Sequence, residues 1–286
     1  MIAAPKTVLT HSLLFLFPLI GVETTFNWLY SLPDVGIALL LGAVGACLLA
    51  GVPFLREKLL RIQVLDDDES EFASKALNVV IGFTGVVLAF SLVQAHNNLR
   101  NLEAQVGTEA HNLAQLDRLL VRYGDPGSGA IRTSLRDYAN SIVRDEWPEL
   151  RKGRPSARTA ALFRPISRGV LAIDPPPGRQ SLIYAEMLKK ADDIAADRKA
   201  RVVAATKLEL PGIFWETIVA LLITLLLLAA FSEATFGRAV ALGAQGFSLA
   251  LLVALVFIYD EPFKGQSSVS SEPIVTVIGE MQNRTE

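Results

Sequence analysis

The 286-residue sequence is poor in the residue types from which catalytic and metal sites are usually built. It has one cysteine, Cys47, so neither an intrachain disulfide nor a thiolate metal centre can form within the chain. Its three histidines are not spaced as zinc ligands, and it has no glycine-rich phosphate loop and no nucleophile elbow. We therefore expect no enzyme activity, no resident cofactor and no nucleic-acid partner.

Apolar residues, in contrast, are abundant and lie in long runs. The chain is 51% hydrophobic and its mean hydropathy is +0.38. Four apolar runs are long enough to cross a bilayer as helices, namely 36–54, 76–95, 213–231 and 239–258. A fifth apolar run, 13–22, contains Pro18, and three interpretations remain open: it spans the membrane, lies in the interface or re-enters. The predicted fold class is an all-α integral membrane protein with the lipid bilayer as its partner.

The second of these runs is predicted to belong to one long helix from Ala76 to about Tyr123. No proline or turn cluster follows Ala95, so the helix is expected to continue into water, and the whole rod would be roughly 70 Å long. In its second part, leucines and a valine recur at spacings of three and four, interrupted by Glu109; these residues are Leu99, Leu102, Val106, Leu113, Leu116 and Leu120. Such a seam is typical of packing against other helices and not against lipid.

Two further helices complete a predicted three-helix domain outside the membrane. The first carries Ile131, Leu135, Tyr138 and Ile142 on one side and ends before Pro148, because the residue before a proline disfavours helix. A basic loop follows over 151–158, and the next helix runs from about Gln180 to Leu208 with Leu182, Met187, Leu188, Ile194 and Val202 as its apolar residues. The predicted domains are 1–33 (N-terminal segment), 34–95 (first transmembrane pair with an acidic linker), 96–211 (helical domain), 212–259 (second transmembrane hairpin) and 260–286 (tail).

A polar stripe on the membrane part of the long helix is the strongest functional signal. Thr84, Ser91, Gln94 and Asn98 fall on one helical face, with Val87 and Leu88 between them. Hydrogen bonding inside a helical bundle is one explanation. The other is a water-lined pore in which hydroxyls and amides replace ion hydration and Val87 or Leu88 forms a dry constriction.

Charged residues suggest structural roles more than chemistry. Glu109 interrupts the apolar seam, and Arg198 and Arg201 follow on a later helix, so a buried ion pair that fixes helix register is expected. The acidic run of Asp66, Asp67 and Asp68 has the ligand type that a hard cation prefers, but its spacing is not that of an EF-hand loop. We favour a solvated linker over a metal site there.

The order of features resembles the bestrophin-like proteins, a mostly bacterial family first defined as a domain of unknown function. The resemblance covers roughly Ala76 to Met281, and its most specific part is the tail motif of Asp260, Pro262, Phe263 and Gly265. Further landmarks are Glu109-Ala110, Tyr138, Asp145-Glu146-Trp147-Pro148, Arg198, Arg201, Pro211, Trp215, Val269 and Glu272-Pro273. Bestrophins themselves are pentameric chloride channels gated by calcium. The dense acidic run that follows the motif in bestrophins is missing here, so the resemblance does not carry a calcium site over to this chain.

The resemblance implies a homo-oligomeric ion channel or channel-like pore with inorganic anions as the permeant species. The alternative is a non-conducting scaffold or sensor whose helical domain binds a partner. The implied location is the bacterial inner membrane. Cations in the short loops on the opposite side (Arg56, Lys58, Arg61, Lys75 and Arg238) favour a helical domain outside the cell by the positive-inside rule. The resemblance places the domain in the cytosol, and we adopt that orientation.

Overall fold

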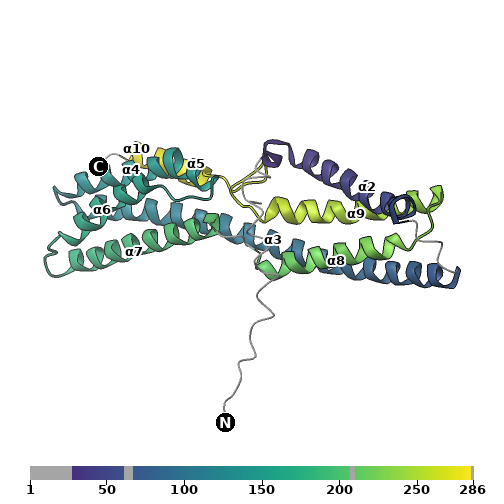
Figure 1. Ribbon diagram of the computed structural model, residues 1–286. Helices are drawn as coiled ribbons and strands as arrows, with labels where there is room; N and C mark the ends of the chain where they lie inside the picture. Colours follow the sequence, from purple (N-terminus) through teal and green to yellow (C-terminus); the bar gives the residue numbers. More distant parts are fainter. Residues whose placement is uncertain (1–27, 61–66, 207–209, 285–286) are drawn as a thin grey trace, which may run out of the picture.

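A computed structural model describes residues 28–60, 67–206 and 210–284 of the chain. The described residues form helices and contain no strand. Two helical bundles lie end to end and share one very long helix, α3 (Figure 1). The elements are η1 (Leu29–Ser31), α2 (Asp34–Leu60), α3 (Asp67–Tyr123), α4 (Ser128–Ser141), η2 (Ile142–Glu146), α5 (Trp147–Leu150), α6 (Ala157–Leu171), α7 (Arg179–Thr206), α8 (Gly212–Ala230), α9 (Phe236–Tyr259) and α10 (Glu272–Asn283).

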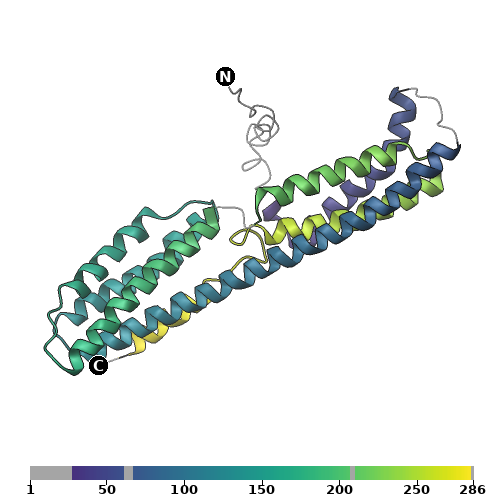
Figure 2. The same ribbon diagram turned by 90° about the horizontal axis from the view of Figure 1, so that it is seen from below.

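The long helix is continuous, as predicted. α3 has 57 residues, which at 1.5 Å per residue makes a rod of about 85 Å. Figure 2 shows it running unbroken along both bundles. It begins at Asp67, nine residues before the predicted start at Ala76, because the end of the acidic linker is itself helical.

The four predicted membrane spans are present. Four helices are long and apolar enough to cross a membrane: Asp34–Lys58 of α2, Ser70–Tyr123 of α3, Gly212–Ala230 (α8) and Phe236–Tyr259 (α9). Their interior is formed by side chains such as Leu49, Leu88, Leu225 and Val256. The apolar run at 13–22, predicted as a fifth membrane element, lies outside the described residues.

Small residues bring α2 and α9 into close contact. A Cβ atom added to Gly45 would lie 2.7 Å from the carbonyl oxygen of Gly246 and 2.5 Å from the Cβ of Ala250. A Cβ added to Gly42 would lie 2.7 Å from the ring of Phe247. The two helices can therefore approach this closely only because these positions lack a side chain.

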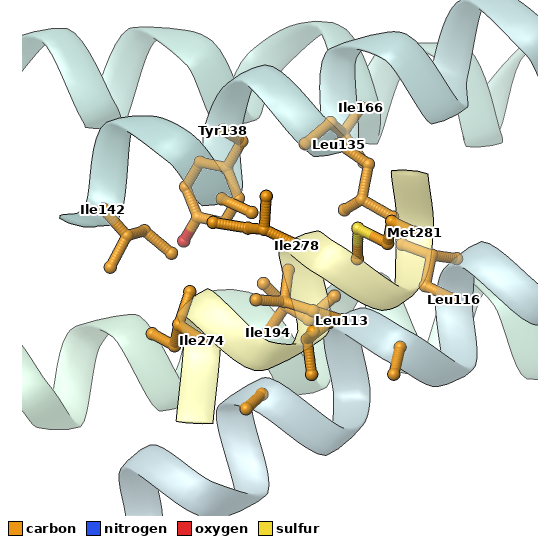
Figure 3. Close-up of a cluster of buried hydrophobic side chains, with 14 of the residues drawn as sticks. Leu113, Leu116, Leu135, Tyr138, Ile142, Ile166, Ile194, Ile274, Ile278 and Met281 are labelled. Carbon is orange, nitrogen blue, oxygen red and sulfur yellow. The ribbon is translucent and has the colours of Figure 1, made fainter. Parts of the chain in front are cut away.

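The second bundle packs α4 to α7 and α10 on the water-exposed half of α3. All six seam residues of α3 from Leu99 to Leu120 are buried, which agrees with the predicted helix-packing role. Figure 3 shows Leu113 and Leu116 of α3 facing Tyr138 of α4 and Ile278 of α10 across this core. The core thus joins segments that lie far apart in the sequence.

The helical domain contains more helices than predicted. Residues 157–171 form α6, most of which follows the predicted loop at 151–158, and the tail forms α10. Pro148 does not end a helix, because the π-helical turn η2 rearranges the backbone hydrogen bonds just before it and the proline falls in the first turn of α5. Leu182, placed on the apolar side of α7 by prediction, is 73% exposed.

Candidate functional site

The polar stripe of α3 does not form one open surface. Thr84, Leu88 and Ser91 are fully buried within this single chain, where α3 packs against α8 and α9. The Thr84 hydroxyl donates a hydrogen bond to the carbonyl oxygen of Val80 at 2.7 Å, and Ser91 donates to that of Val87 at 3.0 Å. The hydroxyl donors are therefore used within the helix itself.

The remaining members of the stripe lie nearer the surface. Val87 and Asn98 are half-buried and Gln94 is exposed. The Gln94 side-chain amide donates to the side-chain oxygen of Asn98 at 2.8 Å. The structure thus buries three of the six predicted pore-lining residues inside the chain and leaves three nearer its surface: Val87 in the middle of the membrane part, and Gln94 and Asn98 near its end.

A different face of α3 is exposed along the membrane part. We call Val79, Phe83, Val86, Phe90 and Val93 the exposed seam; their side chains are 53–72% exposed. Val79, Val86 and Val93 recur every seven residues, as do Phe83 and Phe90, so the five form one stripe on the helix. Sequence reasoning missed this stripe because an apolar face in an apolar helix gives no contrast, although the seven-residue repeat was visible.

The tail motif lies at the junction of the two bundles. Asp260 is 2% exposed, and its carboxylate accepts hydrogen bonds from the Leu210 backbone N–H and the Trp215 indole N–H, both at 2.7 Å. Burial raises the pKa of Asp260 above its ordinary value, and the two hydrogen bonds oppose that shift. Asp260 therefore ties the end of α9 to the start of α8.

The other motif residues turn the chain back towards the helical domain. The buried ring of Phe263 packs edge-on against Trp147 with 5.6 Å between centroids. The carbonyl oxygen of Pro262 accepts a hydrogen bond from the Val269 N–H at 2.8 Å, which closes a loop. Gly265 adopts a φ of 77°, a left-handed conformation that favours glycine. The motif is therefore a connector between the two bundles.

The predicted ion pair forms between Arg201 and Glu109. Both side chains are 1% exposed, and the guanidinium meets the carboxylate through two hydrogen bonds of 2.8 and 2.9 Å. Arg198 does not contact Glu109; its Nε lies 3.1 and 3.2 Å from the two carboxylate oxygens of Glu146. Arg201 also reaches Glu146 at 3.0 Å. Two arginines of α7 therefore bind two carboxylates, one from α3 and one from η2.

Aromatic side chains surround this charge cluster. The Arg201 guanidinium carbon lies 5.2 Å from the ring centroid of Trp147, within the range of a cation–π contact. Tyr138 is fully buried, and burial raises the pKa of its hydroxyl above the usual range. Because Trp147 also contacts Phe263, the cluster is connected through packing to the tail motif.

Comparison with known proteins places these features in one family. The model of the Bestrophin-like domain matches residues 43–274. The chain belongs to this family. None of the curated proteins matches it.

Solved structures share the bestrophin-like fold. A bacterial bestrophin homologue from Klebsiella pneumoniae with a point mutation is 16% identical, with a TM-score of 0.55 over 86% of this chain and 97% of that chain. Another structure of the Klebsiella pneumoniae homologue, phased with zinc, gives 16% identity and a TM-score of 0.54 over 88% of this chain and 100% of that one. A point mutant described as a membrane protein is 15% identical, with a TM-score of 0.54 over 87% of this chain and 98% of that chain. At these identities the likeness establishes the fold.

The residues beside the bestrophin-like tail motif do not fit a calcium ion. Glu261, the carboxylate next to Asp260, is paired with the Lys264 ammonium at 3.1 Å, and that ammonium also lies 5.6 Å from the ring centroid of Tyr30. The Lys264 ammonium therefore already pairs with the Glu261 carboxylate. The described residues contain no group of three or more histidine, cysteine or acidic side chains that could hold a metal. Asp66 lies outside the described residues, as do the side chains of Asp67 and Asp68.

Proposed function

We propose that this bestrophin-like protein is a homo-oligomeric ion channel or channel-like pore that conducts inorganic anions, and not an enzyme. Membership of the family supports a channel-like function, and the fold is that of bacterial bestrophin homologues. The four long apolar helices are consistent with a multi-pass membrane protein. We place it in the bacterial inner membrane with the helical domain in the cytosol.

The exposed seam of α3 is the observation that carries the proposal. Within one chain, α3 buries its opposite face in both bundles, so the seam is left without a partner over the membrane part. A stripe of large apolar side chains with a seven-residue repeat is suited to pack with copies of itself or to narrow a pore. We therefore assign the pore-facing surface to Phe83, Val86 and Phe90, with Thr84, Leu88 and Ser91 supporting the helix from inside.

Purified protein in planar bilayers tests this function. We expect single-channel currents that carry chloride. Replacing both Phe83 and Phe90 by alanine should widen the narrow part of the pore and raise the unitary conductance. The matched control replaces Leu39 and Leu48 of α2, which are also exposed apolar residues, and should leave conductance unchanged. Liposomes that remain tight to ions at every voltage and calcium concentration would refute the proposal.

A non-conducting scaffold or sensor is the second candidate. Leu171, at the end of α6, and Leu182, near the start of α7, are 63% and 73% exposed at the turn that joins these two helices. Two exposed leucines close to one turn are suited to contact a partner protein. If this candidate holds, changing Leu171 and Leu182 to serine abolishes the cellular phenotype, whereas apolar replacement of Thr84, Ser91 and Gln94 leaves it intact.

A further inference from the structure

The exposed seam of α3 continues beyond the membrane part with a change in chemistry. The line of Val79, Val86 and Val93 reaches Arg100 after seven more residues, so the arginine lies on the same face of the helix. The neighbouring line of Phe83 and Phe90 continues through exposed polar and small residues, namely Asn97, Ala104 and His111. The stripe is therefore apolar in the membrane part and polar directly after it.

Arg100 is the first full charge on this helix after Lys75, which is paired with Glu71. Its side chain is exposed, and among the residues that the structure describes it takes part in no ion pair. Glu103, the nearest acidic residue along the helix, lines a recess with Val269 and Glu272 of the tail. Arg100 thus forms no ion pair with a described carboxylate, although the exposed Glu103 follows one turn later on the helix.

We propose that Arg100 is the residue that determines charge selectivity in this protein, by attracting anions to the water-side mouth of the pathway behind the apolar constriction. The inference rests on the proposed channel function, and it adds which side chain sets the sign of the permeant ion. In an oligomer whose copies present this face to a common axis, each copy contributes one guanidinium at the same level. Several fixed cations around a narrow opening raise the local anion concentration and repel cations.

The physical origin of this effect predicts its salt dependence. The Debye length is about 30 Å at 0.01 M and about 3 Å at 1 M ionic strength, so a ring of charges acts across the opening only in dilute salt. Selectivity that depends on Arg100 should therefore be strong in dilute salt and weak in concentrated salt. Selectivity that arises from pore width or from fixed carbonyl groups would not change in this way.

Reversal potentials in sodium chloride gradients test the proposal with purified full-length protein in bilayers. Arg100→Gln should lower the chloride-to-sodium permeability ratio by about threefold or more in dilute salt, and Arg100→Glu should lower it further. Arg100→Lys keeps the charge and should keep the ratio. The control is Arg179→Gln, an exposed arginine at the start of α7, which should have no effect. An unchanged ratio in both Arg100→Gln and Arg100→Glu channels overturns the inference and leaves the channel function standing.

Cross-linking between copies tests the placement of Arg100 without any current. The single native cysteine is first removed by Cys47→Ala, and Val93→Cys or Arg100→Cys is then introduced. If this face surrounds a common axis, oxidation should link chains through both positions, but not through the exposed control Lys189→Cys on α7. Failure of both positions to cross-link, even where the protein conducts, places Arg100 away from the axis and overturns the proposal.

Discussion

At the level of single residues, Arg201 is a buried cation of the helical domain that binds two buried carboxylates. Its guanidinium binds Glu109 of α3 and Glu146 of η2, and all three side chains are almost fully excluded from solvent. Removing one partner from a buried charge pair costs more than the pair contributes, because the remaining charge stays buried without compensation. The cluster therefore makes correct folding of the domain depend on one α7 side chain.

Replacing Arg201 by leucine should lower the free energy of unfolding by about 3–5 kcal/mol. Arg198→Leu should lower the free energy of unfolding by less, because the Arg198 side chain is 20% exposed and Glu146 would still be paired with Arg201. Thermal unfolding in detergent measures both effects, and the double variant Glu109→Leu with Arg201→Leu should recover part of the loss. Equal melting temperatures for the Arg201 variant and the native protein would contradict the structural role.

Trp215 allows a second test at the junction of the bundles. Trp215→Phe keeps the ring but removes the indole N–H that donates to the buried Asp260 carboxylate. Loss of this donor should lower the free energy of unfolding by about 1–3 kcal/mol and raise the pKa of Asp260 further above its ordinary value. Thermal unfolding in detergent at neutral pH measures the loss; Trp28→Phe, at a 56% exposed position, is the control and should show none.

The charge cluster also shows where prediction from sequence ends at this scale. A buried pair between Glu109 and an arginine of α7 could be predicted, because a carboxylate in an apolar seam needs a cation. Which arginine it binds could not be predicted, since Arg198 and Arg201 are one turn apart and small rotations of α7 exchange them. The part of Glu146 in the ion pairs was missed, because its burial depends on the π-helical turn, which no pattern in the sequence predicts.

At the level of helices, the contact between α2 and α9 depends on the absence of side chains. Gly45→Leu would force the backbones apart and should lower the free energy of unfolding by about 1–3 kcal/mol or more. Gly51 lies on the same helix with open space around the position of its missing Cβ, so Gly51→Ala should be neutral or slightly stabilising. Thermal unfolding of the two variants in detergent distinguishes the loss of stability from a disrupted α2–α9 contact from the change in stability due to helix propensity alone.

The helices also differ in how well the sequence predicts them. α3 and the two later spans were predictable because long apolar runs, and on α3 a helical repeat of apolar residues from Leu99 to Leu120, leave few alternatives. α6 was missed because it follows a basic stretch and contains Pro165, which reads as a break. α10 was missed although Ile274, Ile278 and Met281 follow helical spacing, because a short segment after a loop motif offers only three turns. The sequence left two positions open for Thr84, inside the bundle or facing a pore. The sequence could not decide between them, because the rotation of α3 is set by its contacts with α8 and α9.

At the level of the whole molecule, the exposed seam of α3 has no partner within the chain, which predicts that the protein associates with copies of itself. Light scattering of the purified protein in detergent should give a protein mass of more than one chain. Alanine at both Val79 and Val93, the two residues of the exposed seam that flank the pore-facing positions, should weaken this assembly, because it removes apolar contact area between copies. The alanine pair at Leu39 and Leu48 on α2 serves as the comparison. A monomeric native protein, or equal loss in both pairs, would argue against assembly through the seam.

The continuity of α3 has a mechanical consequence. A stiff helix embedded in both bundles works as a lever, since it transmits a tilt over its whole length without the slack of a flexible linker. A tilt of about 5° about its membrane end would carry its far end about 7 Å sideways. A ligand or protein that pushes on the tip of the helical domain would thus exert torque directly on the residues inside the bilayer.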